Sequence, residues 1–177
     1  MKKIYALTVL GPDRVGIVSK ITSHLAREKI NIADSSMTRL RREFAMILLL
    51  KSPIMLDEKF SKKLKKQLPD LSFFLRELNP DELKKSPEPK KILNIVLYGA
   101  DRIGLVYRLT STLARKNINI INLQTKVLDL RPPTYLLILE AELPAGLSLE
   151  KVKFFFKPLS ARLKVNLTVS ESEATKL

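Results

Sequence analysis

A repeat of 22 residues constrains this chain more than any other feature of the sequence. The first copy runs from Gly11 to Ile32 and the second from Gly99 to Ile120, and thirteen of the 22 positions are identical without a gap. Most of the other positions exchange similar side chains, as where Ile21 becomes Leu109. An internal duplication of this kind predicts two copies of one structural unit. A chain of 177 residues has room for two small domains.

Each copy predicts a strand, a glycine-bearing loop and a helix. An apolar run bounded by glycine precedes each copy, at residues 4–10 and 92–98, and predicts a buried strand. Asp13 and Asp101 stand where an N-cap would stand, with carboxylates able to accept N–H bonds of the first helical turn. After each loop we expect an apolar stripe at helical spacing to face the core. It comprises Val15, Val18, Ile21 and Leu25 in one copy and Ile103, Val106, Leu109 and Leu113 in the other.

The remainder of the first half predicts two strands, a helix and a last strand. Polar-apolar alternation at 35–40, a charged turn at 41–43 and an apolar run at 44–50 predict a hairpin whose second strand is central and buried on both faces. Apolar residues at helical spacing with lysines between them predict a helix over 56–68, and a strand follows over 72–78.

The second half predicts the same order of elements. An extended segment reaches about residue 129, and Pro132 and Pro133 lie in the turn after it. The predicted elements that follow are a strand over 134–143, a helix over 149–162 that Pro158 kinks or starts late, and a strand over 164–170 before a frayed end at 171–177.

The domain organisation expected from this pattern is two α+β units joined by a linker. The first domain covers 1–79, a linker rich in proline and charge covers 80–91, and the second domain covers 92–177. Two βαββαβ units, each with an antiparallel four-stranded sheet and two helices on one face, are ferredoxin-like folds. Such sheets leave edges and one face uncovered, so we expect the units to pack together and the chain to form a homodimer. The fold alone decides no function.

Composition argues against an enzyme and against a metal or cofactor site. The sequence has no cysteine, and its one histidine, His24, is expected on the surface or at a boundary of the first helix. It contains no phosphate loop of the Walker type, no dinucleotide glycine fingerprint and no set of His, Asp and Glu residues for a metal. We therefore expect no catalytic residues, no metal ligands and no cofactor.

The net charge of +14 keeps one alternative open, an RNA- or DNA-binding basic βαββαβ protein. The charge is spread evenly, with 19 basic against 11 acidic residues in 1–90 and 13 against 7 in 91–177, and a solvated lysine-rich surface is the interpretation we favour. RNA-recognition modules place stacking aromatics in their first and third strands, where this sequence offers Tyr5, Phe44 and little else. Direct nucleic-acid binding is therefore not expected.

No apolar stretch has the length of a membrane span, and the apolar run at the start is too short for a secretory signal. A cytoplasmic protein with no membrane contact is expected.

Particular motifs carry a family resemblance. Residues 10–18, Asn31-Ile32 and Arg42-Glu43-Phe44 look like an ACT domain. The same holds in the second half for residues 101–106, Asn119-Ile120 and residues 133–146. Two such domains and nothing more resemble the glycine cleavage system transcriptional repressor family, whose members are stand-alone tandem ACT proteins without a DNA-binding domain.

The resemblance implies a sensor of a small amino acid, such as glycine or serine, that regulates transcription or metabolism through contact with a protein partner. The ligand would lie near the loop between the first strand and the first helix, often at a seam between two ACT units. One position departs from the family, because Val15 and Ile103 stand where proline is often found. The candidate ligand residues are Gly11, Pro12, Asp13, Arg14, Val15, Gly16 and Asn31, with Gly99, Ala100, Asp101, Arg102, Ile103, Gly104 and Asn119.

The loops also have a physical basis for anion binding, beside a purely structural alternative. A glycine loop that runs into a helix N-terminus presents unpaired N–H groups and the positive end of the helix dipole, which favour a carboxylate. The glycines could equally make a tight turn and nothing more. Arg14 and Arg102 could hold a carboxylate or be solvated. Asn31 and Asn119 could complete a ligand's hydrogen bonds or act as helix C-caps.

Overall fold

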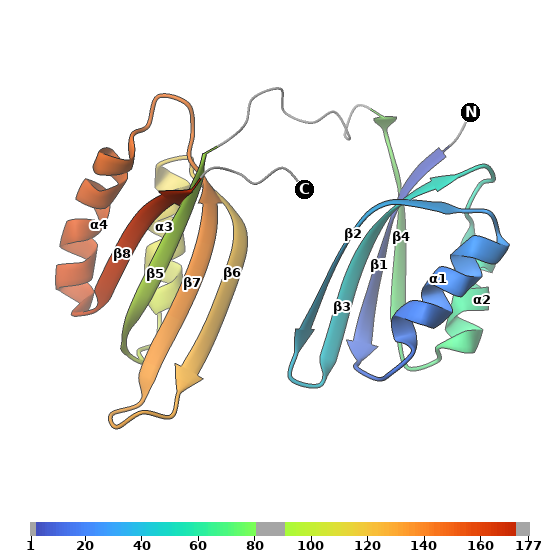
Figure 1. Cartoon of the computed structure of the whole chain (residues 1–177), viewed down its shortest axis with the longest axis horizontal. Helices are drawn as coiled ribbons and strands as arrows, with labels where there is room; N and C mark the ends of the chain where they lie inside the picture. The colour runs from blue at the N-terminus through green and yellow to red at the C-terminus, as the bar shows by residue number, and fades with distance from the viewer. Residues whose placement is uncertain (1–2, 81–90, 173–177) are drawn as a thin grey trace. The chain divides into compact units, whose positions relative to one another are not determined.

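The computed structural model describes residues 3–80 and 91–172, in two compact units divided into Met1–Lys85 and Ser86–Leu177. Both units have the predicted βαββαβ order (Figure 1). Most of the predicted linker, residues 81–90, lies outside the described residues. Unit 1 consists of β1 (Lys3–Pro12), α1 (Ile17–Arg27), β2 (Asn31–Leu40), β3 (Glu43–Ser52), α2 (Glu58–Gln67) and β4 (Ser72–Leu78). Unit 2 consists of β5 (Ile92–Ala100), α3 (Leu105–Arg115), β6 (Asn119–Leu128), β7 (Thr134–Glu142), α4 (Leu149–Leu163) and β8 (Asn166–Ser172).

Each unit is built on one antiparallel four-stranded sheet. The strand orders are β2-β3-β1-β4 and β6-β7-β5-β8, and every neighbouring pair is antiparallel. The two helices of each unit lie on one face of its sheet (Figure 1). The predicted pair of ferredoxin-like α+β domains is therefore confirmed.

The core of each unit lies between the helices and the covered face of the sheet. In β1, Tyr5, Leu7 and Val9 alternate with more exposed residues and pack with side chains of α1 and α2, such as Ile21 and Leu64. Burying an aliphatic or aromatic side chain of this size contributes about 1.5–3 kcal/mol. The equivalent core of unit 2 gathers Leu93, Ile95, Leu97, Leu109, Leu113, Val152 and Phe156.

One expectation about the sheet of unit 1 needs correction. Strand β3 is central but is buried on one face only, because both helices cover the same face: Phe44 is 2% exposed while Ile47, on the open face, is 51% exposed. The aromatics considered for RNA stacking, Tyr5 and Phe44, both lie in the core. They are therefore unable to form a stacking platform on the sheet surface.

The predicted ends of several elements move for identifiable local reasons. Helix α2 starts at Glu58 because the Asp57 side chain accepts N–H bonds from Lys59 and Phe60, at 2.9 and 3.2 Å. Helix α4 contains Pro158 but starts at Leu149, so the proline does not delay it. The last strand begins at Asn166, and the expectation of fraying at 171 and 172 is wrong because β8 extends to Ser172. Residues 173–177 lie outside the described part.

His24 is buried, contrary to the expectation of a surface or boundary residue. Only 4% of it is exposed, because it lies on the side of α1 that faces α2. Its Nδ1 is 3.2 Å from the Nε2 of Gln67, and its ring centroid is 5.3 Å from that of Phe60. Within residues 3–80 and 91–172, no hydrogen-bond partner lies within reach of its Nε2. Burial lowers the pKa of His24 from its ordinary value, and the charges of Lys63 and Arg27 act in the same direction while that of Glu28 opposes them.

None of the described helices has the length and apolarity that crossing a bilayer would require.

Candidate ligand site in the glycine loops

The first glycine of each loop has a structural reason to be glycine. A Cβ on Gly11 would lie 2.8 Å from the carbonyl oxygen of Asp70, and Gly11 has a φ of 152°. A Cβ on Gly99 would lie 2.8 Å from the Cγ1 of Val165. Both loops therefore approach the connection between the second helix and the last strand too closely for a side chain. Gly11 and Gly99 position the loop, and their presence needs no ligand to explain it.

The second glycine of each loop starts the helix. Gly16 and Gly104 are the N-caps of α1 and α3, with left-handed φ values of 90° and 87°. Their carbonyl oxygens accept the first helical N–H bonds, from Lys20 and Arg108, both at 3.0 Å. A Cβ on either glycine would meet no atom within 4 Å. The position that a Cβ would take at either glycine is therefore open.

The aspartates of the loops are not the N-caps, which corrects the expectation from sequence. Asp13 lies three residues too early and serves the hairpin instead: its N–H donates to the Arg42 carbonyl at 2.7 Å, and its Oδ2 accepts from the Arg39 guanidinium at 3.5 Å. Asp101 is exposed and also precedes the cap, Gly104. Neither α1 nor α3 receives a side-chain hydrogen bond at its cap.

Val15 and Ile103 also depart from their predicted place in the apolar stripe. Both helices begin two residues later, so these side chains lie in the loop before the helix, and both are fully exposed, at 103% and 106%. The buried stripe of α1 begins at Ile17 and that of α3 at Leu105. Each loop therefore presents an aliphatic side chain to solvent beside the helix start.

The two helices of each unit start in contrasting ways. Helices α2 and α4 are capped by the side chains of Asp57 and Ser148, and each has a glutamate in its first turn. Helices α1 and α3 have no side-chain cap and no acidic residue in the first turn. Their first N–H groups thus keep the positive end of the helix dipole without a negative partner of their own.

A basic residue in the first turn of both helices was missed by reasoning from the sequence. Lys20 and Arg108 occupy equivalent positions, both exposed, four residues after the capping glycines. A cation near a helix N-terminus opposes the dipole, so its presence in both copies suits an anion bound there. The sequence did carry a signal for this residue, because the same position of the repeat is basic in both copies, lysine in the first and arginine in the second.

The loop arginines reach other parts of the protein. Arg14 Nη2 lies 3.4 Å from the carboxylate of Asp70, and Arg102 Nη1 donates to the carbonyl oxygen of Leu163 at 3.4 Å. These two acceptors lie near the close approaches of Gly11 and Gly99, so the arginines help to hold the loops against the connection that follows the second helix.

The asparagines do not meet the loops within either unit. Asn31 pairs with Lys51 and Lys51 with Ile4, whereas Gly11 pairs with Phe44. Gly11 and Ile4 are separated by seven residues of β1, about 23 Å of strand. Asn119 lies at the same far end of unit 2, where its Nδ2 donates to Glu142 Oε2 at 3.4 Å. Neither asparagine is a C-cap, because Glu28 and Lys116 occupy those positions.

Comparison with known proteins gives a family match for the first unit. Residues 3–76 match the family model described as the ACT domain. This match spans most of the first unit. In the second unit, strand order and loop geometry repeat those of the first unit.

The matches to relatives in sequence cover short segments. The chain is 45% identical over 49 residues to a UPF0237 protein of Methanosarcina mazei, and 52% identical over 44 residues to a UPF0237 protein of Methanopyrus kandleri. These matches cover 28% and 25% of this chain and 53% and 49% of the relatives. The chain thus spans about half the length of the curated relatives it matches.

Two solved structures share the whole tandem fold. A protein of unknown function from Galdieria sulphuraria superposes with a TM-score of 0.81 at 24% identity, covering 97% of this chain and 99% of that one. A proposed glycine cleavage system transcriptional repressor superposes with a TM-score of 0.68 at 19% identity, covering 98% and 99%. At these identities the likeness establishes the fold alone, two βαββαβ units in one chain.

Proposed function

We propose that this chain is a regulatory protein whose two units each sense a small amino acid, such as glycine or serine, at the start of the first helix. The ligand's carboxylate would accept N–H bonds at the uncapped turns of α1 and α3, with Lys20 and Arg108 adding charge. The observation that carries the proposal is the contrast in capping, since both first helices lack a side-chain cap while both second helices have one. The match of residues 3–76 to the ACT domain supports it.

The candidate ligand residues divide into roles under this proposal. Gly16 and Gly104 leave room for the ligand and expose the N–H groups, while Val15 and Ile103 flank the opening. Gly11, Pro12, Asp13 and Arg14 shape the first loop, as Gly99, Ala100, Asp101 and Arg102 shape the second. Asn31 and Asn119 stand too far away within a unit to take part.

We further propose that the signal passes to another protein, in the cytoplasm, from a homodimer of the chain. The regulatory name carried by one structural neighbour supports this direction. Catalysis forms no part of the proposal, and neither does sequence-selective binding of nucleic acid. In unit 1 the strand aromatics that could have stacked on bases, Tyr5 and Phe44, are buried in the core.

The first experiment is a thermal-shift screen of the full chain against the amino acids, followed by calorimetry on the best ligand. A ligand that binds only the folded state raises its apparent stability. Lys20→Glu and Arg108→Glu should each weaken binding about tenfold or more, because a charge-assisted hydrogen bond contributes about 1.5–3 kcal/mol. Lys66→Glu, an equal charge change at an exposed position of α2, is the control. Equal affinity in all three variants would exclude the helix starts as the site.

A further inference from the structure

Two grooves lie in equivalent places of the two units and away from the glycine loops. One, of about 610 Å³, runs between α2 and β4 in unit 1. The other, of about 540 Å³, runs between α4 and β8 in unit 2. Neither is lined by any residue of 11–16 or 99–104. The proposed amino-acid site leaves both grooves without a role.

The groove of unit 1 follows a free sheet edge. Strand β4 pairs only with β1, so its other side has no ladder partner among the described strands. Ser72, Phe73, Phe74 and Leu75, four consecutive residues of β4, line the groove. Proteins commonly protect such edges with charges, prolines or bulges. Residues 72–75 include none of them, whereas the next two residues of β4, Arg76 and Glu77, are charged. The backbone of 72–75 is therefore available to an added strand.

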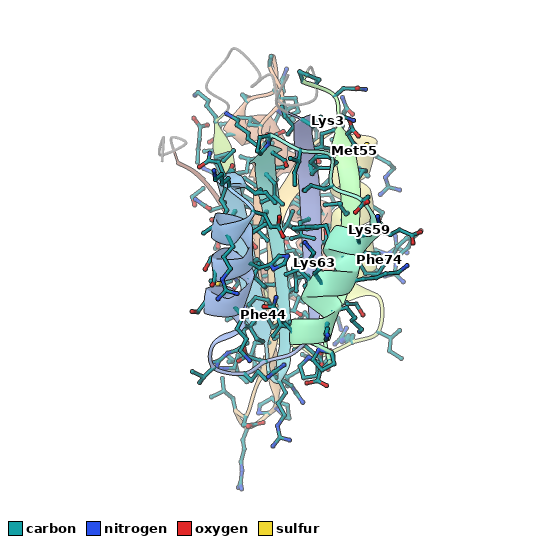
Figure 2. All side chains as sticks on the ribbon, turned by 90° about the vertical axis from the view of Figure 1, so that its right-hand side faces the viewer. Lys3, Phe44, Met55, Lys59, Lys63 and Phe74 are labelled. Atoms are coloured by element: carbon teal, nitrogen blue, oxygen red, sulfur yellow. The ribbon has the colours of Figure 1, made fainter. Side chains whose placement is uncertain are left out.

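The side chains along this edge offer contacts on both faces. Phe73 and Leu75 point toward the helices and pack against the core, while Phe74 points to the open face and is 63% exposed. Figure 2 shows Phe74 on the flank of unit 1 where α2 and β4 lie, with Lys59 on the same flank. An added strand would alternate its side chains between these two faces. A bulky apolar residue on it would meet Phe74.

The helix beside the edge is strongly basic. Helix α2 has five lysines and one glutamate among its ten residues, a surplus of 5 − 1 = +4. Lys62 and Lys65 line the groove, where Lys62 pairs with Glu58 at 3.1 Å and Lys65 donates to the Leu71 carbonyl at 2.7 Å. Asp57 and Glu58 also line it, but Asp57 is engaged as the helix cap. The four charged residues that line the groove therefore balance, two acidic and two basic. The surplus of α2 comes mainly from its other lysines, Lys59, Lys63 and Lys66, whose field favours an anionic occupant beside the helix.

This charge decides between two possible occupants. A second copy of the chain, pairing β4 with β4 about a two-fold axis, would extend the sheet and bring two α2 helices side by side, each with a surplus of +4. An acidic segment would find the opposite charge instead. We propose that the α2/β4 groove binds an acidic, extended peptide segment of a partner protein, which adds a strand to β4 and packs an apolar side chain on Phe74.

The groove of unit 2 provides a natural contrast. Thr168 pairs with Val96 as Phe74 pairs with Thr8, so threonine occupies the position of the exposed phenylalanine. The exposed aromatic of this groove, Phe154, belongs to α4 instead and is 74% exposed. Helix α4 carries four basic residues and one glutamate, a surplus of 4 − 1 = +3. We expect the unit 2 groove to bind the same peptide more weakly.

The test uses the full chain labelled with ¹⁵N and a fluorescein-labelled peptide of ten residues in which glutamate alternates with valine and one central phenylalanine. We expect the peptide to bind saturably and more weakly as salt is added. Binding should shift the NMR signals of the β4 amides and protect these amides from hydrogen exchange. Phe74→Thr, which copies unit 2, should weaken binding about tenfold. Its melting temperature should not fall, because Phe74 is largely exposed. Lys62→Glu should also weaken binding, and a peptide with lysine in place of glutamate should not bind.

Several results would overturn the proposal. The proposal fails if the acidic peptide does not bind, or if the lysine peptide binds as tightly as the acidic one. It also fails if Phe74→Thr has the peptide affinity of the parent, or if the peptide protects only amides of β2 from exchange. A dimer without peptide that Phe74→Thr converts to monomer would assign the edge to a second copy. Tighter binding of single-stranded RNA, competing with the peptide, would assign it to nucleic acid. The amino-acid affinity of Phe74→Thr should equal that of the parent, so failure here leaves the proposed sensing function standing.

Discussion

Unit 1 and unit 2 keep the same loop on differently packed helices. Both start the first helix at an uncapped, left-handed glycine where the position of a Cβ is open. The units differ in how the first helix packs. His24 of α1 is buried against α2. The equivalent residue of α3, Thr112, is only partly buried, and its Oγ1 donates to the carbonyl oxygen of Arg108 at 2.8 Å. The helix start is thus the same in both units while the packing behind it differs, as expected if the proposed ligand binds at the helix start.

The largest expected difference between the units concerns their first glycines. Gly11→Ala should destabilise unit 1 by about 2–4 kcal/mol, since a Cβ meets the Asp70 carbonyl and φ is positive. Gly99→Ala should cost about 1–3 kcal/mol, because its contact is the Val165 side chain and φ is ordinary. Urea unfolding measures both.

A second substitution separates backbone strain from crowding. Val165→Ala should recover much of the loss caused by Gly99→Ala, since it removes the contacting methyl group. Leu71→Ala should not rescue Gly11→Ala, because the Asp70 carbonyl and the φ remain. Rescue in both units would show that side-chain crowding alone distinguishes these glycines from alanine.

Capping should separate the second helices from the first. Asp57→Ala should lower the free energy of unfolding by about 1 kcal/mol, because the carboxylate accepts two N–H bonds. Ser148→Ala should cost less, since Ser148 accepts one bond at 3.4 Å. Asp101→Ala should cost under about 0.5 kcal/mol, since Asp101 caps no helix. An equal loss in Asp57→Ala and Asp101→Ala, measured by thermal melts, would contradict the assigned helix starts.

Unit 1 should also lose stability in mild acid where unit 2 does not. Burial lowers the pKa of His24 in the folded state, so the unfolded state takes up the proton first as pH falls through the ordinary histidine pKa of about 6.5. The stabilisation is present above that pH and is lost below it. Hydrogen exchange in each unit between pH 7.5 and 5.5 measures the effect. The substitution His24→Gln should remove this pH dependence. If unit 1 of the variant loses as much stability in acid as unit 1 of the parent, the effect belongs to other groups, such as the Glu28–Lys63 pair.

The smallest expected effect is that of the asparagines on ligand affinity. Asn31→Gly and Asn119→Gly should leave the amino-acid affinity within about twofold, because each lies about 23 Å of strand from its own loop. Asn119→Gly also removes the bond to Glu142, so its melting temperature is the control for folding. A loss of tenfold or more in either variant would mean that an asparagine of a second molecule reaches the loop.

The sequence predicted the fold well because duplication and periodicity report it directly. The strand over 72–78 and the start of α4 at Leu149 match, since alternation and a serine cap are local signals. Asp13 and Val15 were placed wrongly for one reason: the glycine that starts the helix lies after them, and an N-cap without a side-chain bond has no signature. The burial of His24 depends on α2, more than thirty residues away.

The candidate site was predicted in part. The glycine loops could be found from the repeat, but the distance between loop and asparagine follows from strand register, which the repeat does not contain. The α2/β4 groove follows from strand order, since β4 lies at the edge only because β1 takes the central place. Lys20 and Arg108 can be recognised as candidate ligand residues only once the residue at which each helix starts is known.

The central claim, that a carboxylate binds the uncapped starts of α1 and α3, is tested most directly by comparing the ligand from the screen with its carboxamide in an amide chemical-shift titration. We predict that the amino acid shifts the amides of Ile17 to Lys20 and of Leu105 to Arg108, and that the carboxamide, which carries no negative charge, binds at least tenfold more weakly. Equal affinity of the two compounds, or shifts confined to residues away from both helix starts, would contradict the account.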